Sequence, residues 1–545
     1  MNNKKITLIN RLSLNGKAAS RRGFLPLLLS ASLACSLPAA QAAGTWNGGG
    51  GVSEFTTPAN WIGGSVPASP YDGILMSGNV QTTVTFASNA TFTQTVGATP
   101  ALLFDSTSTG SFTFGGTGTL TVNGVNVNAF SNTSGHQQTI NNDLIWNSNA
   151  GFIYASGAGS IFTIGGNINN TAGVVALGGG GGSVVQINGG VSGSGVTVNA
   201  SGGIAELNGI NTYTGVTTIY GGTLKVSHDA LVNVDGSLGH ASSAVAMGNA
   251  ALNPTFLTVG ALSIARSFSL ATGTGIKTIG GDTTDISTYS GTITMGNGAG
   301  TAASSLTVTA VAGGRVNFTG NLTRLGNATV TDTLTKTGAG IAALSGTNNY
   351  QGTTTVSTGT LLINGTLDNT GANVSVASGA TLGGNGTINR SGSLAAGGIL
   401  SAGDMVGTTS QVGTLAFGSG GATSGLTMLG TSVLKFDLQQ GNFTVGGGIN
   451  DLVTVGGNLT LDGTLQVTEL GGSLTNGTYR LFSYTGTLTD NTLAIDSAFL
   501  TAHAGSTIDT SVANQINLLV VPEPATLILL TFSLTTVMIL RRRCA

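Results

Sequence analysis

A 24-residue segment occurs twice in this chain, and this repetition limits the available folds more than any other feature. Residues 203–226 align without gaps on residues 340–363, and 13 of the 24 positions are identical. A unit of this length cannot bury an apolar face alone, whereas stacked copies build one continuous core. The repetition therefore predicts a solenoid. The identical positions include Leu207/Leu344, Asn211/Asn348, Tyr213/Tyr350, Gly215/Gly352 and Leu224/Leu361.

Between the predicted turns, aliphatic residues alternate with threonine or another polar residue. Examples are residues 118–123, 222–226, 306–309, 373–376 and 464–468. This alternation is typical of short strands with one buried face. Glycine and asparagine interrupt the strands, and Asn-Gly and Gly-Gly pairs supply the positive φ of tight turns. The body of the chain is therefore predicted to be all-β.

The strands are too short for most sandwich folds, so we expect a parallel β-helix, with tandem β-sandwiches as the alternative. In a β-helix, aliphatic residues stack in rows inside the coils while glycine and asparagine turn the corners. Corner asparagines can hydrogen-bond to the next coil, which satisfies backbone groups that would otherwise be buried unpaired.

Composition excludes several classes of function. Charged residues make up 7% of the chain, against about 25% in typical soluble domains. Because no basic stripe is present to neutralise phosphates, we expect no nucleic-acid partner. The two cysteines are Cys35 and Cys544, one near each end. The body between them therefore has no disulfide or thiolate metal site.

The N-terminal residues 1–42 read as an export signal peptide. A basic region without acidic residues precedes an apolar core, and Ala40 and Ala42 frame a small-residue cleavage site. Arg21 and Arg22 resemble a twin-arginine motif. The alternative is a general secretory signal whose basic region happens to end in two arginines.

The C-terminal residues 521–545 combine an extended tripeptide, an apolar run and a basic end. Pro522 and Pro524 hold Glu523 in extended backbone, the run 525–540 is predicted to form a transmembrane helix, and arginines stop it at the cytoplasmic side. The run is slightly short of the roughly 17–25 residues of a spanning helix, which snorkelling arginines can compensate. The residues concerned are Val521, Pro522, Glu523 and Pro524, followed by Arg541, Arg542 and Arg543.

This C-terminal pattern resembles the PEP-CTERM sorting signal of bacterial envelope proteins. The resemblance implies that a membrane transpeptidase, an exosortase, removes the helix and delivers the protein to the cell surface or the exopolysaccharide matrix. The alternative is an ordinary C-terminal anchor that is never cut.

The two repeats resemble the autotransporter-associated β-strand repeat. An apolar residue is followed by Gly-x-Asn-x-Tyr-x-Gly, a Thr-Thr pair and Gly-Thr-Leu, in residues 203–226 and again in residues 340–363. The resemblance implies a right-handed parallel β-helix of the kind found in exported passengers.

The sequence offers no reactive constellation, so we expect no catalytic, cofactor-binding or metal-binding residues and no enzyme activity. The four histidines lack metal-ligand spacing, and the acidic residues are dispersed rather than paired at fixed offsets. Tyr213, Tyr350, Trp46 and Trp61 could stack on sugars, but packing at turns and at the end of the solenoid is the favoured interpretation.

These patterns divide the chain into five regions. Residues 1–42 are the export signal, 43–200 an N-terminal β-rich region, 201–365 a solenoid with both repeats, 366–520 a C-terminal solenoid region, and 521–545 the sorting signal. We expect an exported protein with a structural or adhesive role, first as a membrane-anchored precursor and then at the surface or in the matrix of a Gram-negative-type bacterium. Its expected partners are the export translocon, the exosortase, the membrane and exopolysaccharide. The alternatives are an extracellular polysaccharide-active enzyme and a carbohydrate-binding β-helix.

Overall fold

The computed structural model describes residues 44–94, 99–123, 128–148, 151–249, 251–296, 303–325, 331–368, 372–406, 409–418 and 424–521. All of them belong to one compact unit, Ala42–Ala545. The predicted signal residues Arg21, Arg22, Ala40 and Ala42, and the predicted sorting residues beyond Val521, lie outside the described part. So does the predicted transmembrane helix. Among the residues that are described, no helix has the length and apolar character needed to cross a membrane.

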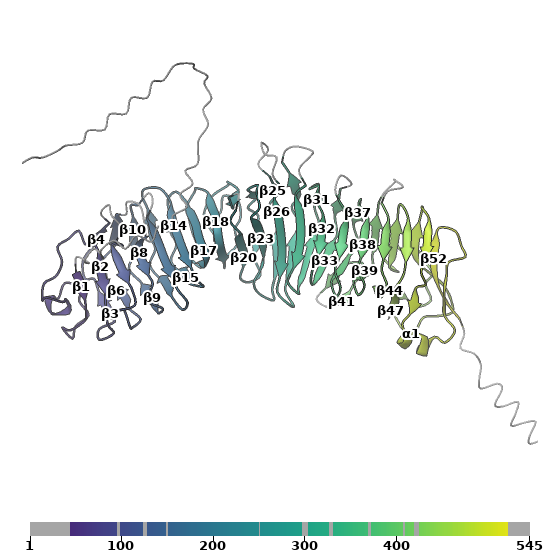
Figure 1. Cartoon of the computed structure of the whole chain (residues 1–545), viewed down its shortest axis with the longest axis horizontal. Coiled ribbons are helices and arrows are strands. Elements are labelled where there is room, and N and C mark those ends of the chain that lie inside the picture. The colour runs from purple at the N-terminus through teal and green to yellow at the C-terminus, as the bar shows by residue number, and fades with distance from the viewer. Residues whose placement is uncertain are drawn as a thin grey trace, which may run out of the picture. The chain divides into compact units, whose positions relative to one another are not determined.

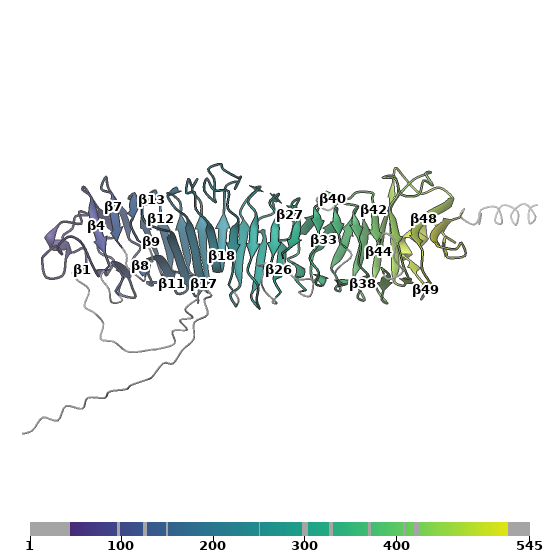
Figure 2. The same cartoon turned by 90° about the horizontal axis from the view of Figure 1, so that it is seen from above.

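The described chain is a parallel β-helix, as Figures 1 and 2 show. Most coils contribute one strand to each of three faces, here named A, B and C in chain order. Strands of successive coils pair in parallel along every face, for example β26 with β29 and β29 with β32. This pairing confirms the solenoid and rules out the tandem sandwiches, which need antiparallel partners. Its right-handedness stays a prediction.

Face A begins as one run of parallel strands. Its strands are β1 (Gly44–Trp46), β2 (Ile74–Met76), β5 (Leu102–Phe104), β8 (Asn128–Asn132), β11 (Phe152–Ser156), β14 (Val175–Gly180), the first part of β17 (Val196–Leu207), the first part of β18 (Thr217–Val226), β19 (Val245–Met247), β22 (Phe268–Leu270), β25 (Ile293–Met295) and β28 (Leu322–Arg324). It continues through β31 (Thr347–Asn348), β34 (Thr366–Leu367), β37 (Thr387–Ile388), β42 (Thr414–Phe417), β45 (Leu452–Val455) and β48 (Gly477–Tyr484).

The strands of face B form an uninterrupted series of parallel pairs along the described unit. It consists of β3 (Thr83–Thr85), β6 (Thr113–Gly115), β9 (Gln137–Ile140), β12 (Ile161–Ile164), β15 (Val184–Ile187), the second parts of β17 and β18, β20 (Pro254–Thr258), β23 (Ile276–Gly281), β26 (Ser305–Ala310), β29 (Thr333–Thr337), β32 (Thr354–Val356), β35 (Val374–Val376), β38 (Gly392–Leu394), β43 (Leu426–Met428), β46 (Leu459–Leu461) and β49 (Leu488–Asp490).

Face C consists of two sheets. The first contains β4 (Ala90–Thr93), β7 (Leu120–Asn123), β10 (Leu144–Trp146), β13 (Ile168–Asn170) and β16 (Val191–Ser192). The second contains β21 (Ser263–Ile264), β24 (Ile286–Tyr289), β27 (Arg315–Phe318), β30 (Ile341–Leu344), β33 (Thr360–Ile363), β36 (Thr381–Gly384), β39 (Ile399–Ala402), β44 (Val433–Gln439), β47 (Thr464–Leu470) and β50 (Ala494–Ile495).

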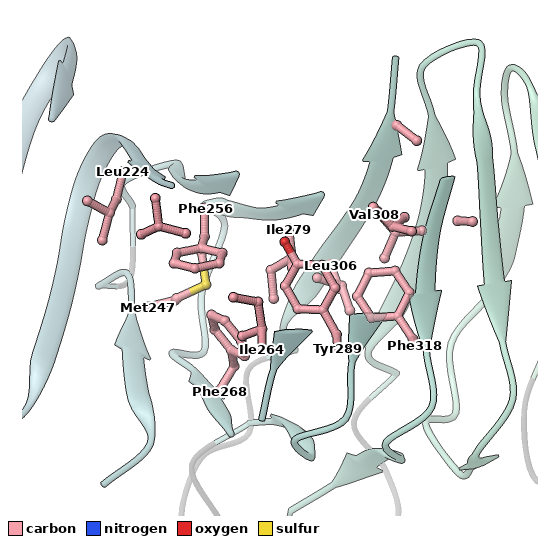
Figure 3. Close-up of a cluster of buried hydrophobic side chains, with 14 of the residues drawn as sticks. Leu224, Met247, Phe256, Ile264, Phe268, Ile279, Tyr289, Leu306, Val308 and Phe318 are labelled. Carbon is pink, nitrogen blue, oxygen red and sulfur yellow. The ribbon is translucent and has the colours of Figure 1, made fainter. Parts of the chain in front are cut away.

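The core consists of apolar rows that run along the inside of these faces. On face B, Leu224, Phe256, Ile279 and Val308 occupy paired positions of successive coils and are all buried. Figure 3 shows this row beside the face C row of Ile264, Tyr289 and Phe318. Each fully buried aliphatic side chain contributes about 1.5–3 kcal/mol, so the stacked rows supply most of the favourable energy of the fold.

Both ends of the stack are closed. At the N-terminal end, the 3-10 helix η1 (Pro58–Asn60) and the residues after it hydrogen-bond to the free edge of β1. There the buried Trp46 and Trp61 rings lie 5.6 Å apart, edge to face. At the C-terminal end, β52 (Gln515–Val520) pairs antiparallel with β48 and with β51 (Thr507–Asp509), beside the helix α1 (Ser497–Ala502). Caps of this kind prevent further strand addition to the open coils.

The two repeats lie on different faces of the solenoid. In the first copy, residues 204–207 and 223–226 are face B strands. The aligned segments 341–344 and 360–363 of the second copy are face C strands. The repeat therefore specifies a local strand–corner–strand unit and not a fixed face. Strand pairing also continues across residues 200 and 365, where the sequence regions were divided.

Candidate functional site

The outer surface of face B carries a continuous ladder of hydroxyl side chains. Eleven successive coils place threonine or serine at the same paired position, and each of these side chains is at least partly exposed. Adjacent rungs are about 4.8 Å apart, the spacing of paired strands. We name this row the hydroxyl ladder. It consists of Thr223, Thr255, Thr278, Thr307, Thr335, Thr355, Ser375, Ser393, Thr427, Thr460 and Thr489.

Inside the repeats, the shared asparagine joins three successive coils. The Oδ1 of Asn348 accepts from the backbone N–H of Leu322 on the preceding coil at 3.1 Å. Its Nδ2 donates to the Gly346 carbonyl at 3.0 Å and to the Thr366 carbonyl on the following coil at 3.1 Å. Asn211 does the same in the first repeat, between Val191 and Ser237. The expected corner role of these asparagines is confirmed.

The shared tyrosines are interior groups. Tyr213 and Tyr350 are fully buried, and their hydroxyls hydrogen-bond to Thr217 and Thr354 at 2.7 and 2.6 Å. Burial raises the pKa of both phenols to about 12. Because Trp46 and Trp61 are buried as well, none of these four rings can stack on a sugar from solvent. Packing at corners and at the end of the stack is their role.

Two buried arginines were missed in the sequence. Arg390 donates from Nε to the Asp368 carbonyl at 2.9 Å, from Nη1 to the Gly352 carbonyl at 2.9 Å, and from Nη2 to the Tyr350 carbonyl. Arg266 is also buried and donates to the carbonyls of Leu238 and Ser243. Both side chains donate hydrogen bonds to carbonyl groups at coil corners, so their role is structural. The one available signal was an arginine in a body that is almost free of charge.

Lys336 occupies an inward position between Val308 and Val356 in the apolar row of face B. Its Nζ donates to the carbonyls of Thr337, Gly338 and Thr358 at 2.7, 2.7 and 3.2 Å. Burial lowers its pKa to about 8.

Asp451 is a further ionisable group whose pKa is strongly displaced. Its Oδ1 accepts from the Gly413 N–H at 2.7 Å and its Oδ2 from the Asp437 N–H at 2.8 Å. Burial, opposed by these hydrogen bonds and aided by the nearby Asp437 carboxyl, raises its pKa to about 8. Since both oxygens are used to hold backbone, the pair Asp437 and Asp451 is not an acid–base pair open to a glycan.

A short hairpin of β40 (Met405–Val406) and β41 (Thr409–Ser410) leaves the coil after β39 and is tied to distant coils. Asp404, just before it, pairs with Arg315 at 3.1 Å and accepts from Asn364 Nδ2 at 3.0 Å. Arg315 also donates to the Met405 carbonyl. The partners are up to 90 residues apart in sequence, so this segment braces several coils together.

The arrangement closest to a catalytic triad is Ser473, His503 and Glu469. Glu469 Oε1 lies 2.6 Å from His503 Nε2, and Ser473 Oγ lies 3.4 Å from the same nitrogen. A triad needs the acid and the nucleophile on different ring nitrogens, so this group cannot activate the serine. Within the described ranges, no three His, Cys, Asp or Glu side chains gather closely enough to hold a metal ion.

Comparison with known proteins assigns the repeats. The passenger-associated-transport-repeat family matches residues 201–226 and 334–363. The chain is also similar to "Adhesin BmaC autotransporter" of Brucella suis biovar 1 (strain 1330), with 49% identity over 111 residues. That match covers 19% of this chain and 3% of the relative. The two segments that match this family model are thus the coil segments that contain the buried asparagines and tyrosines.

Proposed function

We propose that this protein is an exported surface or matrix protein whose β-helix has a structural and adhesive role. The observation that carries the proposal is the hydroxyl ladder on a continuous parallel stack that contains passenger-associated-transport-repeats. The ladder presents many neutral donors and acceptors in a regular array, which suits weak, repeated contacts with polyhydroxylated matrix polymers. The similarity to a protein named as an autotransporter adhesin supports the same role.

The proposal includes sorting through Val521, Pro522, Glu523 and Pro524, with the helix 525–540 and Arg541, Arg542 and Arg543 as membrane stop. The precursor would be held in the membrane until the exosortase cuts it. Export would depend on residues 1–42. The twin-arginine and general secretory routes are both compatible with Arg21, Arg22, Ala40 and Ala42.

The sorting step is tested by fractionating cells that produce the chain with Glu523→Ala, with Thr526→Ala in the same segment as control. We expect the Glu523 variant to accumulate as a membrane-bound precursor and the control to reach the surface at the parental mass. Equal distribution and mass of the two variants would refute sorting through this motif.

The adhesive role is tested on the surface of face B. The double variant Thr335→Lys/Thr355→Lys places long charged side chains on the ladder. The control variant Thr360→Lys/Thr381→Lys places them on outward positions of face C. We expect only the face B pair to reduce retention of the protein on exopolysaccharide, by about tenfold if several contacts are lost together. An equal loss of retention in both double variants would show that the hydroxyl ladder is not the adhesive surface.

A polysaccharide-active enzyme is not favoured by any observation on the described residues. The buried carboxyl of Asp451 serves the backbone, and the Glu469–His503 pair lacks triad geometry. Release of sugars from a glycan panel by the purified protein would nevertheless overturn the non-enzymatic assignment.

A further inference from the structure

The outer surface of face A carries most of the aromatic rings that the described chain leaves in contact with solvent. Among the described Phe, Tyr and Trp side chains, four are not buried, and three of these lie on strands β11 and β18 of face A. On β11, Phe152 and Tyr154 alternate with Ile153 and Ala155, which point into the core and are fully buried. Phe152 and Tyr154 therefore point outward. The third ring, Tyr220 of β18, is 42% exposed.

The two rings of β11 lie over Gly178, the residue of β14 that pairs with Tyr154. A Cβ atom at position 178 would lie 2.8 Å from Tyr154 Cδ2 and 3.0 Å from Phe152 Cδ1. Both distances are shorter than ordinary van der Waals contacts, so the rings occupy the space that a side chain at this position would take. Glycine thus lets the two rings lie side by side on the next coil.

The strands β11, β14, β17 and β18 follow one another along face A, as the order of β11, β17 and β18 in Figure 2 shows. Three rungs separate Tyr154 from Tyr220, roughly 14 Å at the spacing of paired strands. Small or uncharged polar residues fill the outward positions between the rings. These residues are Ala176, Gly178, Thr197, Asn199 and Thr218. We name this surface, from Phe152 and Tyr154 to Tyr220, the aromatic strip.

The aromatic strip lies in a part of the chain without charge. Residues 144–205 and 207–224 contain no Asp, Glu, Lys, Arg or His. Glu206 and Lys225 occupy paired positions on face B and not on face A. A phosphate, sulfate or carboxylate group on a partner would therefore lose its water without gaining a cation. The strip is suited to a neutral partner.

The strip is also too small for a stable contact with a second protein. A whole aromatic side chain buries about 150–250 Å², and all three rings are already partly covered. A specific protein–protein contact needs about 800 Å² on each partner. A thin polymer chain, in contrast, gains affinity from local contacts that repeat along its length.

We propose that the aromatic strip binds a chain of neutral polysaccharide that runs along the axis of the solenoid. The rings of Phe152, Tyr154 and Tyr220 offer apolar surface to the C–H faces of sugar rings. The exposed amide of Asn199 and the threonine hydroxyls donate and accept hydrogen bonds as sugar hydroxyls do. The inference rests on the adhesive role proposed above and gives it a second surface, on a different face from the hydroxyl ladder.

The experiment is affinity electrophoresis of the full chain, purified in detergent, through gels that contain mixed-linkage β-glucan, galactomannan or dextran as neutral polymers and alginate as an acidic one. We expect at least one neutral polymer to retard the protein and alginate to leave its mobility unchanged. The variant Phe152→Ala/Tyr154→Ala should weaken binding about tenfold. Gly178→Ala keeps both rings but displaces them, so it should weaken binding as well.

Two control variants separate the strip from aromatic rings in general. Tyr154→Phe keeps the ring, and Phe443→Ala removes the exposed ring that lies outside the strip, in the loop after β44. Both should bind as the parent does. Because Tyr154→Phe and Gly178→Ala remove no side chain from the core, they keep the test decisive even if the double alanine variant unfolds.

The strip is refuted if no neutral polymer retards the parent, if alginate binds as tightly, or if Phe443→Ala weakens binding as much as the double variant. A parent that sediments as a dimer, with Phe152→Ala/Tyr154→Ala as a monomer, would assign the strip to a second copy of the chain and refute the polysaccharide. Normal binding by the double variant, with loss of binding in the ladder variant Thr335→Lys/Thr355→Lys, would refute the strip and leave the proposed function standing. Retention of the protein in the cytoplasm would refute the proposed function without changing the binding of the purified chain.

Discussion

The guanidinium carbon of Arg390 lies 4.6 Å from the centroid of the Tyr350 ring, and both side chains are buried. The tyrosine comes from the second repeat, and the arginine lies two coils further along the stack, at the corner between β37 and β38. Since Arg390 also bonds to the carbonyls of Gly352 and Asp368, it fastens the corner of the repeat to the coils that follow. The repeat is thus completed by a residue outside its own sequence.

Arg390→Lys should therefore destabilise the solenoid although it keeps the charge. A lysine cannot reach three separate carbonyls with a planar fork or lie flat on the ring. The expected loss is about 1.5–3 kcal/mol in the free energy of unfolding, measured by chemical denaturation. Lys435→Arg, at an exposed position of β44, should change it by less than about 0.5 kcal/mol. Equal effects of the two changes would contradict the role of Arg390.

The variant Asn348→Asp keeps the hydrogen-bond acceptor of this corner side chain and removes its donor. The carboxylate can still accept from Leu322 but cannot donate to Gly346 and Thr366. We expect a loss of about 1–3 kcal/mol. The neighbouring Asn349 is exposed and uses only its Oδ1, as acceptor from the Arg324 N–H at 2.8 Å. Asn349→Asp should be tolerated, and thermal unfolding of the two variants checks the difference.

Stability should depend on pH in two windows of opposite sign. The Asp451 carboxyl, with its pKa raised to about 8, stays protonated in the folded state while the unfolded chain ionises near pH 4. The folded state then loses stability as pH rises from about 4 to about 8. Lys336, with its pKa lowered to about 8, is neutral in the folded state above that pH, so stability rises from about pH 8 to about pH 10.5.

Denaturation midpoints at pH 5, 8 and 10 check both windows by difference from variants. Asp451→Asn should remove the fall between pH 5 and 8, although it lowers stability throughout because one backbone N–H loses its acceptor. Lys336→Met should remove the rise between pH 8 and 10. Parallel pH profiles for the parent and both variants would contradict the assignment of these two groups.

The sequence predicted which residues form strands and corners better than it predicted which residues of different coils are paired. Alternating residues marked the strands, and Asn211 and Asn348 act at corners as expected, because both signals are local. The hydroxyl ladder was not predictable, because the spacing between rungs varies: Ser375 and Ser393 are 18 residues apart, whereas Ser393 and Thr427 are 34 apart. Because the loops between strands differ in length, the sequence does not show which threonines occupy paired positions in neighbouring coils.

The buried charged side chains were the other feature that the sequence did not predict. A lone lysine or arginine between polar neighbours reads as a solvated position. Nothing in the sequence around Lys336 or Arg390 shows the distant carbonyl groups that accept their hydrogen bonds. The brace between Arg315 and Asp404 depends on contacts 89 residues apart, beyond any local pattern.

The most direct measurement is cysteine labelling of intact cells with a membrane-impermeant maleimide. With Cys544 replaced by serine, and Cys35 lost with the predicted signal, Thr355→Cys would place one thiol on the hydroxyl ladder and Val356→Cys one in the core. The account predicts that intact cells label the Thr355 variant and that the Val356 variant reacts only after denaturation. Equal labelling of both thiols in the folded protein, or labelling of the Thr355 variant only after lysis, would contradict an exported solenoid.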